Sequence, residues 1–439
     1  MGVTAPAVAA AEVTDAILAD LVSGTHRGVV VDSPPGAGKS TLVVRAALEL
    51  ATSGQPIMIV AQTNEQVDDL IVRLAPDLAV LRPDARVGRL SRAGFLAPPR
   101  LSALANVVVG SGLPDLNDPL VTIATAAKWA HVRDRTWPWA IVDEAYQMRS
   151  DALLTLAPRF ERALFVGDPG QLDPFSTVEN DRWRGLLWDP MQSAVSVLLR
   201  NNPDVPVHRL PVSWRLPHSA QDVVASAFYP YTGFRTGTGP GERELSFTTP
   251  RFGRNALDGV LGLAAESGWG LLELPARHTM RTDAEAVQAV ADVTTRLLQR
   301  GAVARSGTSS APVGPDRIAV GAAHRDQVAA IRAALGDVPV TVDTANRLQG
   351  REYDVTVFLH PLSGRRDATA FHLEAGRLCV LASRHRQACV VVARAGIRDL
   401  LDAHPSSAPV HLGDPVKFPD GWAANQTMMA HLESHAVRY

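Results

Sequence analysis

Residues 28–50 constrain the fold more than any other part of the sequence. Residues 28–31 are a valine-rich run that predicts a strand, and residues 40–50 have the composition of a helix. Between them lies the segment 33–40, Ser-Pro-Pro-Gly-Ala-Gly-Lys-Ser, which is rich in small residues. A strand that enters a glycine-rich loop and leaves as a helix begins a β-α-β unit, and such units build parallel sheets.

The loop at 33–40 has the residues that binding of a nucleoside triphosphate (NTP) requires. Small residues let backbone N–H groups approach phosphates, and the helix N-terminus adds a positive dipole end. Lys39 is expected to contact the β- and γ-phosphates, and the Ser40 hydroxyl to bind Mg²⁺. The expected nucleotide-binding residues here are Pro35, Gly36, Ala37, Gly38, Lys39, Ser40 and Thr41. Ser33 stands where glycine is usual. The alternative to a phosphate-binding loop is a Gly-Pro turn whose only role is to begin a helix.

The alternation of strands and helices continues along the chain. In the first half, strands are predicted at 57–60, 121–124, 140–142 and 163–166, and a helix at 65–74. In the second half, strands are predicted at 317–321, 338–342, 355–358 and 389–393. The fold class is therefore α/β, with two parallel sheets flanked by helices in domains 1–200 and 201–401. Residues 229–256 predict a loop or hairpin excursion, and residues 402–439 a C-terminal tail of no assigned role.

Two adjacent carboxylates follow the buried strand near residue 141. Asp143 and Glu144 end the segment 139–144, Trp-Ala-Ile-Val-Asp-Glu. An NTP site with Mg²⁺ needs one carboxylate to hold the metal and another to activate the attacking water. We expect Asp143 on the metal and Glu144 as the general base. The alternative is an ordinary exposed acid pair at a strand end.

Composition excludes several classes of protein. The 439 residues are 46% hydrophobic and 20% charged, which is typical of a globular protein rather than a disordered one. The net charge of -2 gives no global basic field, so nucleic-acid binding would need a local basic surface. No apolar run approaches the roughly 20 residues that span a bilayer, so we expect a cytoplasmic protein with no membrane partner. Cys379 and Cys389 lie in apolar, strand-like sequence and predict buried reduced thiols.

A collinear series of motifs narrows the choice among P-loop enzymes. Residues 143–147 (DEAYQ) look like the DEAxQ motif of superfamily 1 helicases, and residues 167–174 (GDPGQLDP) resemble their motif III. The remaining matches are 59–70 to motif Ia, 214–216 and 226–229 to the Tyr-Arg-Met and Phe-Tyr segments, 342–352 to motif V and 377–386 to motif VI. The chain resembles a compact form of the 1B branch, the senataxin-like and nonsense-decay helicases. The resemblance implies two RecA-like domains with the nucleotide site in the interdomain cleft.

The resemblance also implies roles for individual residues. Gln171 would sense the γ-phosphate, and Arg215 and Arg384 would act as arginine fingers, with structural ion pairs as their alternative. Glu352 would contact the ribose or be a solvated strand-end acid, and Gly350 belongs to the nucleotide-binding set. The expected nucleic-acid contacts, each with an alternative as a capping or turn residue, are Thr63, Asn64, Thr125, Arg325 and Thr344.

The sequence departs from this branch in three respects. The branch places a base-reading glutamine upstream of the P-loop, whereas the first glutamine here is Gln55. Asn346 stands where motif V normally has an aspartate. The segment between Leu74 and Leu120 is too short for the accessory β-barrel and helical stalk of larger relatives. These departures predict weak discrimination among bases and a motor without those accessory parts.

A cluster of arginines in that short segment suggests a track for nucleic acid. Its members are Arg82, Arg86, Arg89, Arg92 and Arg100. A row of arginines could follow a phosphate backbone, with Arg86 and Arg89 as the central contacts. The alternative is a solvated face of an arginine-rich protein. Trp137, Trp139, Phe175 and Trp214 are interpreted as core residues rather than base-stacking ones.

Together these features predict an NTP hydrolase, a superfamily 1 helicase or translocase that uses ATP or another NTP with Mg²⁺. We expect a monomeric motor moving 5′-to-3′ on single-stranded DNA or RNA, with DNA slightly favoured and the choice between the two left open. The alternative is a nucleic-acid-stimulated NTPase switch within a partner protein complex that does not unwind. A P-loop ATPase unrelated to nucleic acid is the third interpretation.

Overall fold

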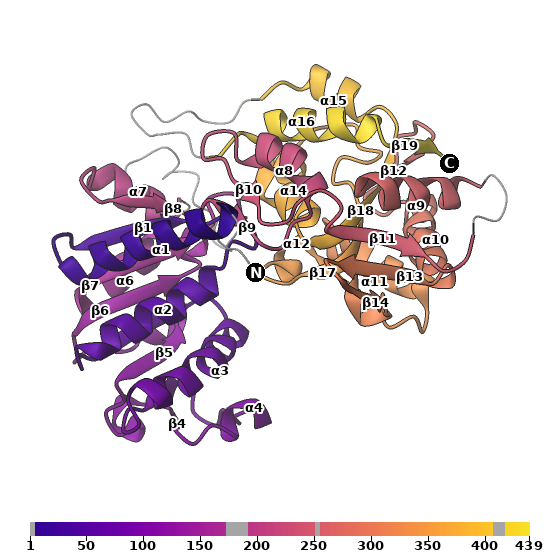
Figure 1. The fold of residues 1–439 in the computed structure, drawn as a ribbon. Coiled ribbons are helices and arrows are strands. Elements are labelled where there is room, and N and C mark those ends of the chain that lie inside the picture. Colours follow the sequence, from indigo (N-terminus) through magenta and orange to yellow (C-terminus); the bar gives the residue numbers. More distant parts are fainter. Residues whose placement is uncertain (1–4, 173–191, 251–254, 407–417) are drawn as a thin grey trace. The chain divides into compact units, whose positions relative to one another are not determined.

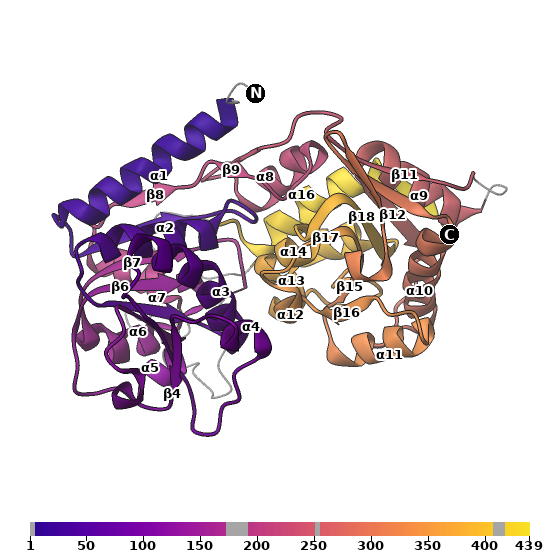
Figure 2. The same cartoon turned by 60° about the horizontal axis from the view of Figure 1, so that its bottom comes forward.

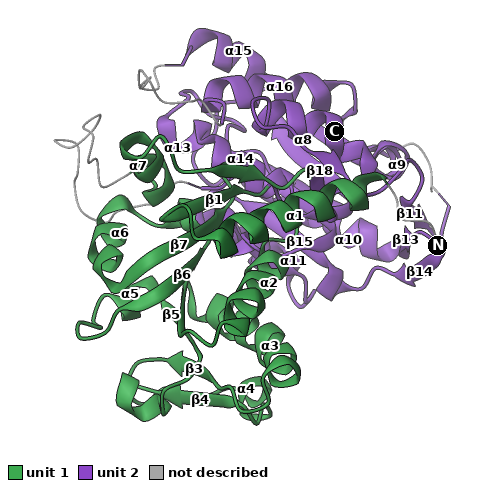
Figure 3. Ribbon diagram, turned by 60° about the vertical axis from the view of Figure 1, so that its left-hand side comes forward, with its two compact units in different colours: residues 1–33, 37–169, 173–211 green, residues 34–36, 170–172, 212–439 purple. Residues whose placement is uncertain are grey.

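The computed structural model describes residues 5–172, 192–250, 255–406 and 418–439. The chain divides into two compact units, coloured separately in Figure 3. The first unit contains residues 1–33, 37–169 and 173–211, and the second contains 34–36, 170–172 and 212–439. The main boundary thus follows Pro211 rather than residue 200, and the described residues 402–406 and 418–439 belong to the second unit instead of forming a separate tail.

The first unit is built on an eight-stranded sheet in which every neighbouring pair is parallel. The strand order is β4-β3-β5-β2-β6-β7-β1-β8. The strands are β1 Gly28–Asp32, β2 Ile57–Ala61, β3 Val87–Leu90, β4 Val107–Gly110, β5 Val121–Thr125, β6 Trp137–Asp143, β7 Phe160–Gly167 and β8 Val207–Arg209. Because all strands run the same way, the loops that follow β1, β2, β5 and β6 emerge at one edge of the sheet.

Helices cover both faces of this sheet, as the alternation of buried side chains requires. Val29 and Val31 pack into one core and Val30 into the other, because successive strand residues point to opposite faces. The first core takes in helices α1 Ala5–Ser23, α2 Lys39–Thr52 and α3 Asn64–Leu81. The second takes in α5 Ala126–Trp129, α6 Ser150–Leu156 and α7 Ala194–Asn201 (Figure 1).

The second unit contains a six-stranded parallel sheet and a small antiparallel one. The large sheet has the order β16-β15-β17-β18-β12-β19. Its strands are β12 Trp269–Leu274, β15 Ile318–Ala322, β16 Thr341–Thr344, β17 Tyr353–Leu359, β18 His385–Arg394 and β19 Ala436–Arg438. The small sheet pairs β11 Arg243–Phe247, β13 Ala302–Ser306 and β14 Ser309–Pro312. The expected excursion at 229–256 therefore includes a strand of this sheet.

Two cores lie on the two faces of the large sheet (Figure 2). One contains residues of α8 Gln221–Phe228, α14 Ala375–Ala382, α15 Ile397–Ala403 and α16 Gly421–Glu433. The other contains residues of α9 Ala256–Ser267, α10 Ala284–Gln299 and α11 Arg325–Leu335. Cys379 and Cys389 are both buried thiols, but Cys379 lies in helix α14 and not in a strand. None of the helices in the described part of the chain could span a bilayer.

The C-terminal residues complete the second unit. Helix α16 buries Met428 and Leu432 in the core next to α8, and β19 extends the sheet beside β12. Asn425 is also fully buried in this helix, where its amide donates to the carbonyl oxygens of Gly421 and Leu373 at 2.7 and 3.3 Å. A polar residue on the buried face explains why the sequence of this helix shows weak periodicity.

If α16 is part of the second core, removing a side chain from it should destabilise the unit. Met428→Ala is expected to lower the free energy of unfolding by about 2–5 kcal/mol, the range for a large side chain cut to alanine in a core. Met280→Ala is the matched control, because Met280 is 86% exposed and should change stability by less than about 0.5 kcal/mol. Chemical denaturation of the full chain measures both, and equal effects would contradict the packing.

Candidate functional site

Backbone geometry at the end of β1 builds the glycine-rich loop. The Ser33 N–H donates to the Gly167 carbonyl at 2.8 Å, which ties the start of the loop to β7. Gly36 and Gly38 have φ angles of 73° and 90°, in the left-handed region that side chains with a Cβ rarely adopt. Gly38 then caps α2, and its carbonyl accepts the first helical hydrogen bond from Leu42 at 3.0 Å. The two glycines therefore shape the turn that lets Lys39 begin a helix.

Lys39 faces Glu144 across the carboxyl edge of the sheet. The Lys39 Nζ lies 3.7 Å from Glu144 Oε1, and their side chains are 12% and 8% exposed. Glu144 has a φ of 52°, an uncommon conformation for this residue type, directly after the last residue of β6. Its N–H donates to Asp143 Oδ1 at 2.9 Å. The P-loop lysine and the two carboxylates predicted from the sequence are thus brought together.

Burial gives this carboxylate pair unusual electrostatics. Burial, reinforced by the charge of Glu144 and opposed by that of Lys39, raises the pKa of Asp143 to about 7. Within the described part of the chain, Glu144 Oε2 is buried and has no hydrogen-bond partner. Two crowded carboxylates with an unsatisfied oxygen fit the all-oxygen coordination that Mg²⁺ prefers. Asp143 and the Ser40 hydroxyl are the residues that would hold such a cation.

A buried carboxylate that the sequence reasoning missed, Asp32, binds Tyr146 close to the carboxylate pair. Asp32, the last residue of β1, is 1% exposed and accepts a hydrogen bond from the Tyr146 hydroxyl. Burial and the charge of Asp32 raise the pKa of Tyr146 well above its usual value. Gln62, after β2, donates to the Asp143 carbonyl at 3.3 Å. These contacts hold the ends of β1, β2 and β6 at fixed spacing. Asp32 could have been found from the sequence, because it is an acid at the end of the strand that precedes the P-loop.

Gln171 lies in the second unit, where its Oε1 accepts from the Gln349 amide. Helix α14 approaches its backbone closely, because a Cβ on Gly376 would lie 2.5 Å from the Gln171 carbonyl oxygen. The hydrogen bond from Gln349 joins the motif III residue Gln171 to the segment expected to be motif V. The other motif III positions Asp173 and Pro174, together with Phe175, lie outside the described residues.

A charged cluster in the second unit contains Arg215. Its Nε lies 3.2 Å from Glu352 Oε2, and Arg386 contacts Glu352 Oε1 at 3.4 Å. Burial raises the pKa of Glu352, but the nearby charges of Arg215 and Arg386 outweigh this effect, so the pKa is lowered overall. Sequence reasoning missed Arg386, which lies two residues after the expected finger. The expected finger, Arg384, is 1% exposed and donates to Ser383 Oγ at 2.8 Å.

Trp214 lies against the glycine-rich loop. Its backbone N–H donates to the Gly36 carbonyl at 2.9 Å, and both residues belong to the second unit. The side chain is 39% exposed, so the interpretation of Trp214 as a core residue is wrong. Trp137 and Trp139 are buried, as expected. Gly350, with a φ of 79°, lies on the exposed turn between α12, Ala345–Leu348, and β17.

The expected nucleic-acid residues occupy the carboxyl ends of strands in each unit. In the first unit, Thr63 and Asn64 follow β2, and Thr125 ends β5. In the second, Arg325 begins α11 after β15, and Thr344 ends β16. Thr63 and Thr125 also cap helices, accepting from the N–H groups of Gln66 and Lys128 at 3.2 and 3.3 Å. Capping, the alternative considered for these threonines, is therefore present alongside a position at the ligand-binding edge.

The arginine cluster does not form a track. Arg89 is fully buried in β3, where its Nε donates to Asp68 Oδ1 at 2.7 Å and its guanidinium also contacts Asn64. Arg86 is exposed but precedes β3, so it lies at the amino edge of the sheet, opposite the P-loop. Arg100 pairs with Asp69 at 2.5 Å. The expectation that Arg86 and Arg89 contact one phosphate backbone is wrong, because strand pleating turns Arg89 into the interior.

Comparisons with known proteins give one family match and several structural ones. Residues 273–396 match a family profile described as an AAA domain. The chain is similar to a structure of the PRRSV helicase (15% identity, TM-score 0.43) and to arterivirus nonstructural protein 10, a helicase, in complex with DNA (14%, 0.43). These alignments cover 92% and 90% of this chain but 62% and 65% of those chains. No curated protein matches the chain.

The buried pair of Arg89 and Asp68 predicts a large effect on stability. Arg89→Ala should lower the free energy of unfolding by about 3–5 kcal/mol, because it removes the hydrogen-bonded cation of the buried Asp68 and leaves only the partly exposed Arg100, at 3.9 Å, as its charged partner. Arg86→Ala, three residues away and exposed, is the control and should have an effect below about 0.5 kcal/mol. Urea unfolding monitored by circular dichroism distinguishes the two. If Arg89→Ala were as stable as the parent, the buried pair would be disproved.

Proposed function

We propose that the chain hydrolyses an NTP and uses the energy to act on single-stranded nucleic acid, as a helicase or translocase. The observation that carries this proposal is the assembly of Lys39, Asp143 and Glu144 at one sheet edge behind a glycine-shaped loop. A cation, a metal-binding carboxylate and a free carboxylate are the groups that phosphoryl transfer to water needs. The match of residues 273–396 to an AAA domain agrees with a nucleotide-dependent activity.

In this proposal, each residue of the site has a distinct role in hydrolysis. Lys39 exchanges its contact with Glu144 for the β- and γ-phosphates when nucleotide binds, which frees the Glu144 carboxylate. Glu144 accepts a proton from the attacking water, and its unsatisfied Oε2 is available for that bond. Mg²⁺, held by Ser40 and Asp143, would neutralise charge on the phosphates. Arg215 is proposed as the arginine finger that stabilises charge on the γ-phosphate, as the sequence resemblance implies.

The polymer is proposed to run along the carboxyl ends of the strands. Thr63, Asn64 and Thr125 in the first unit and Arg325 and Thr344 in the second supply hydroxyl, amide and guanidinium donors for phosphates. We further propose 5′-to-3′ movement, which rests on the sequence resemblance, and single-stranded DNA or RNA as the polymer, with DNA favoured. Residues 82–120 add β3 and β4 to the sheet and no separate accessory domain, and this favours the second candidate, an NTPase switch that binds a strand without unwinding it.

Replacing Lys39 or Glu144 should strongly reduce turnover, but only the loss of Lys39 should also weaken nucleotide binding. Lys39→Ala removes the cation from the phosphates, so both nucleotide affinity and hydrolysis should fall. Glu144→Gln keeps the shape but removes the base, so nucleotide binding should persist while kcat falls by about 10²–10⁴-fold, the usual contribution of general base catalysis. A fluorescent nucleotide analogue measures binding, and phosphate release measures turnover. Parental turnover in Glu144→Gln would contradict the assignment of the base.

The same assay tests the polymer. Hydrolysis by the full chain should increase when single-stranded DNA or RNA is added, and Lys39→Ala is the control that reports contaminating hydrolysis. An unchanged rate with both polymers would contradict the nucleic-acid part of the proposal while leaving the NTPase intact. A strand-displacement assay with the same preparation then separates unwinding from the switch.

The exposed Trp214 ring predicts how the base is held. No glutamine precedes the P-loop, so we propose that stacking on Trp214 holds the base and that GTP and ATP are used with kcat/KM values within about tenfold. Trp214→Ala should raise the KM for both nucleotides about 5–150-fold, since stacking of a base on an aromatic ring contributes about 1–3 kcal/mol. Trp214→Phe, which keeps a ring, is the control. A strong preference of the parent for ATP would mean that another group reads the base.

A further inference from the structure

Three loops of the second unit emerge side by side at the carboxyl edge of its sheet. They are residues 275–283 after β12, 323–325 after β15 and 360–374 after β17. In open parallel sheets, ligands bind outside the carboxyl ends of the strands. Arg325 and Thr344, which were expected to contact nucleic acid, lie at this same edge. The loop at 360–374, however, carries residues to which the sequence reasoning assigned no function.

This edge presents an aromatic platform. The rings of His324 and Phe371 are stacked nearly flat, with centroids 4.8 Å apart and an interplanar angle of 20°. Phe371 remains 40% exposed. The Arg377 guanidinium lies 3.9 Å from the centroid of the Phe371 ring. The platform therefore has a stacked backing and an exposed aromatic surface.

A chain of hydrogen bonds orients the platform. The Nε2 atoms of His324 and His372 are 2.9 Å apart, and Thr369 Oγ1 lies 2.7 Å from His372 Nδ1. Burial, reinforced by the charges of nearby arginines including Arg365, lowers the pKa of both histidines to about 4. Both rings are thus neutral near pH 7, when one histidine donates to the other. A neutral, oriented ring is a suitable backing for a stacked base.

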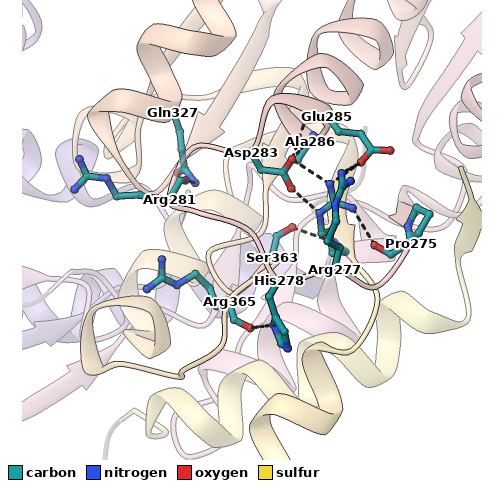
Figure 4. Close-up of polar contacts among 11 residues, drawn as sticks. Pro275, Arg277, His278, Arg281, Asp283, Glu285, Ala286, Gln327, Ser363 and Arg365 are labelled. Carbon is teal, nitrogen blue, oxygen red and sulfur yellow. Dashed lines mark hydrogen bonds and ion pairs between the residues drawn. The ribbon is translucent and has the colours of Figure 1, made fainter.

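The buried guanidinium of Arg394 fixes the loops after β12 and β17, and Figure 4 shows its partners Pro275, Asp283, Glu285 and Ser363. Arg394 is 1% exposed and donates to both oxygens of Asp283 at 2.5 and 3.0 Å, to Glu285 at 2.7 Å and to the Pro275 carbonyl at 2.9 Å. Its backbone N–H donates to Ser363 Oγ at 2.9 Å. One residue at the end of β18 thereby holds loop 275–283 and loop 360–374 together.

Direct contacts between the two loops add to this. The Thr279 N–H donates to the Gly364 carbonyl at 2.8 Å, and His278 Nδ1 lies 3.3 Å from the Arg365 carbonyl. Figure 4 shows the side chains of Arg281 and Arg365 extending to the same side, away from Asp283 and Glu285. Their ion pairs are with exposed acids, Asp326 and Asp367. Such pairs are weak and can be exchanged for phosphates.

We propose that Phe371 stacks on a base of the bound single strand, with His324 behind it and Arg281, Arg325 and Arg365 contacting the neighbouring phosphates. This inference rests on the proposed function and deepens it, because it states that bases as well as phosphates are held. Stacking tolerates any sequence, since every base has an aromatic face, but it requires an unpaired base. The second unit would therefore select single strands over duplex independently of sequence.

The experiment compares two labelled oligomers of equal length, thymidine and abasic, by fluorescence anisotropy with the full chain. The parent should bind the thymidine oligomer more tightly. Phe371→Ala should weaken binding of that oligomer about 5–150-fold and leave abasic binding nearly unchanged. Phe371→Leu preserves apolar cover over Arg377 but lacks a ring, so it should behave like Phe371→Ala. Tyr231→Ala, which removes an aromatic that is 55% exposed outside these loops, should match the parent.

The outcomes separate the two proposals. Equal weakening of both oligomers by Phe371→Ala, or parental behaviour of Phe371→Leu, would show that Phe371 only covers Arg377 and would overturn the stacking. Parental affinity of Phe371→Ala for both oligomers would overturn it as well. A parent that binds neither oligomer yet hydrolyses NTP would instead overturn the nucleic-acid part of the proposed function. Arg365→Ala should weaken both oligomers alike and make the salt dependence less steep, because it removes a phosphate contact.

Discussion

The candidate site depends on a buried ammonium held 3.7 Å from a buried carboxylate at the edge of a parallel sheet. Two adjacent carboxylates in a low-dielectric position cannot both stay charged without a cation, and the raised pKa of Asp143 expresses that cost. Lys39 supplies part of the compensating charge. Under the proposed function, a bound metal and a phosphate would reorganise all three groups at once.

The parallel arrangement of the strands positions functional residues in each of the two sheets separately. Because every strand runs the same way, loops after different strands gather at one edge of each unit. In the first unit that edge carries the P-loop, the carboxylates and the threonines after β2 and β5. In the second it carries the platform of His324 and Phe371 and the loops fixed by Arg394. NTP hydrolysis and nucleic-acid binding are thus both proposed to occur at the carboxyl ends of parallel strands, one in each sheet.

The residues of the P-loop and of β6 could be predicted because their chemistry is local. Two glycines with positive φ and Lys39 lie within a few residues of the end of β1, and the acids Asp143 and Glu144 lie at the end of β6. The arginine cluster failed for the opposite reason: whether Arg89 faces water or the interior depends on the pairing of β3 with β4 and β5. Trp214 was assigned to the core because aromatic residues usually are buried, yet its position beside Gly36 leaves it 39% exposed. The same dependence on tertiary position separates Arg384, which is buried, from Arg386, which reaches Glu352.

The sequence by itself determined the α/β class, the position of the glycine-rich loop and the position of an acid pair at the end of a strand. These follow from hydrophobic periodicity and from the conformations that glycine alone adopts easily, both of which act over short stretches of chain. Only the tertiary structure decided that residues 421–438 belong to the second unit, that Asp32 supports the site, and that Phe371 rests on His324. Each of these depends on contacts between residues far apart in the chain. Such contacts are selected by which surfaces can be buried together, and no local pattern encodes that choice.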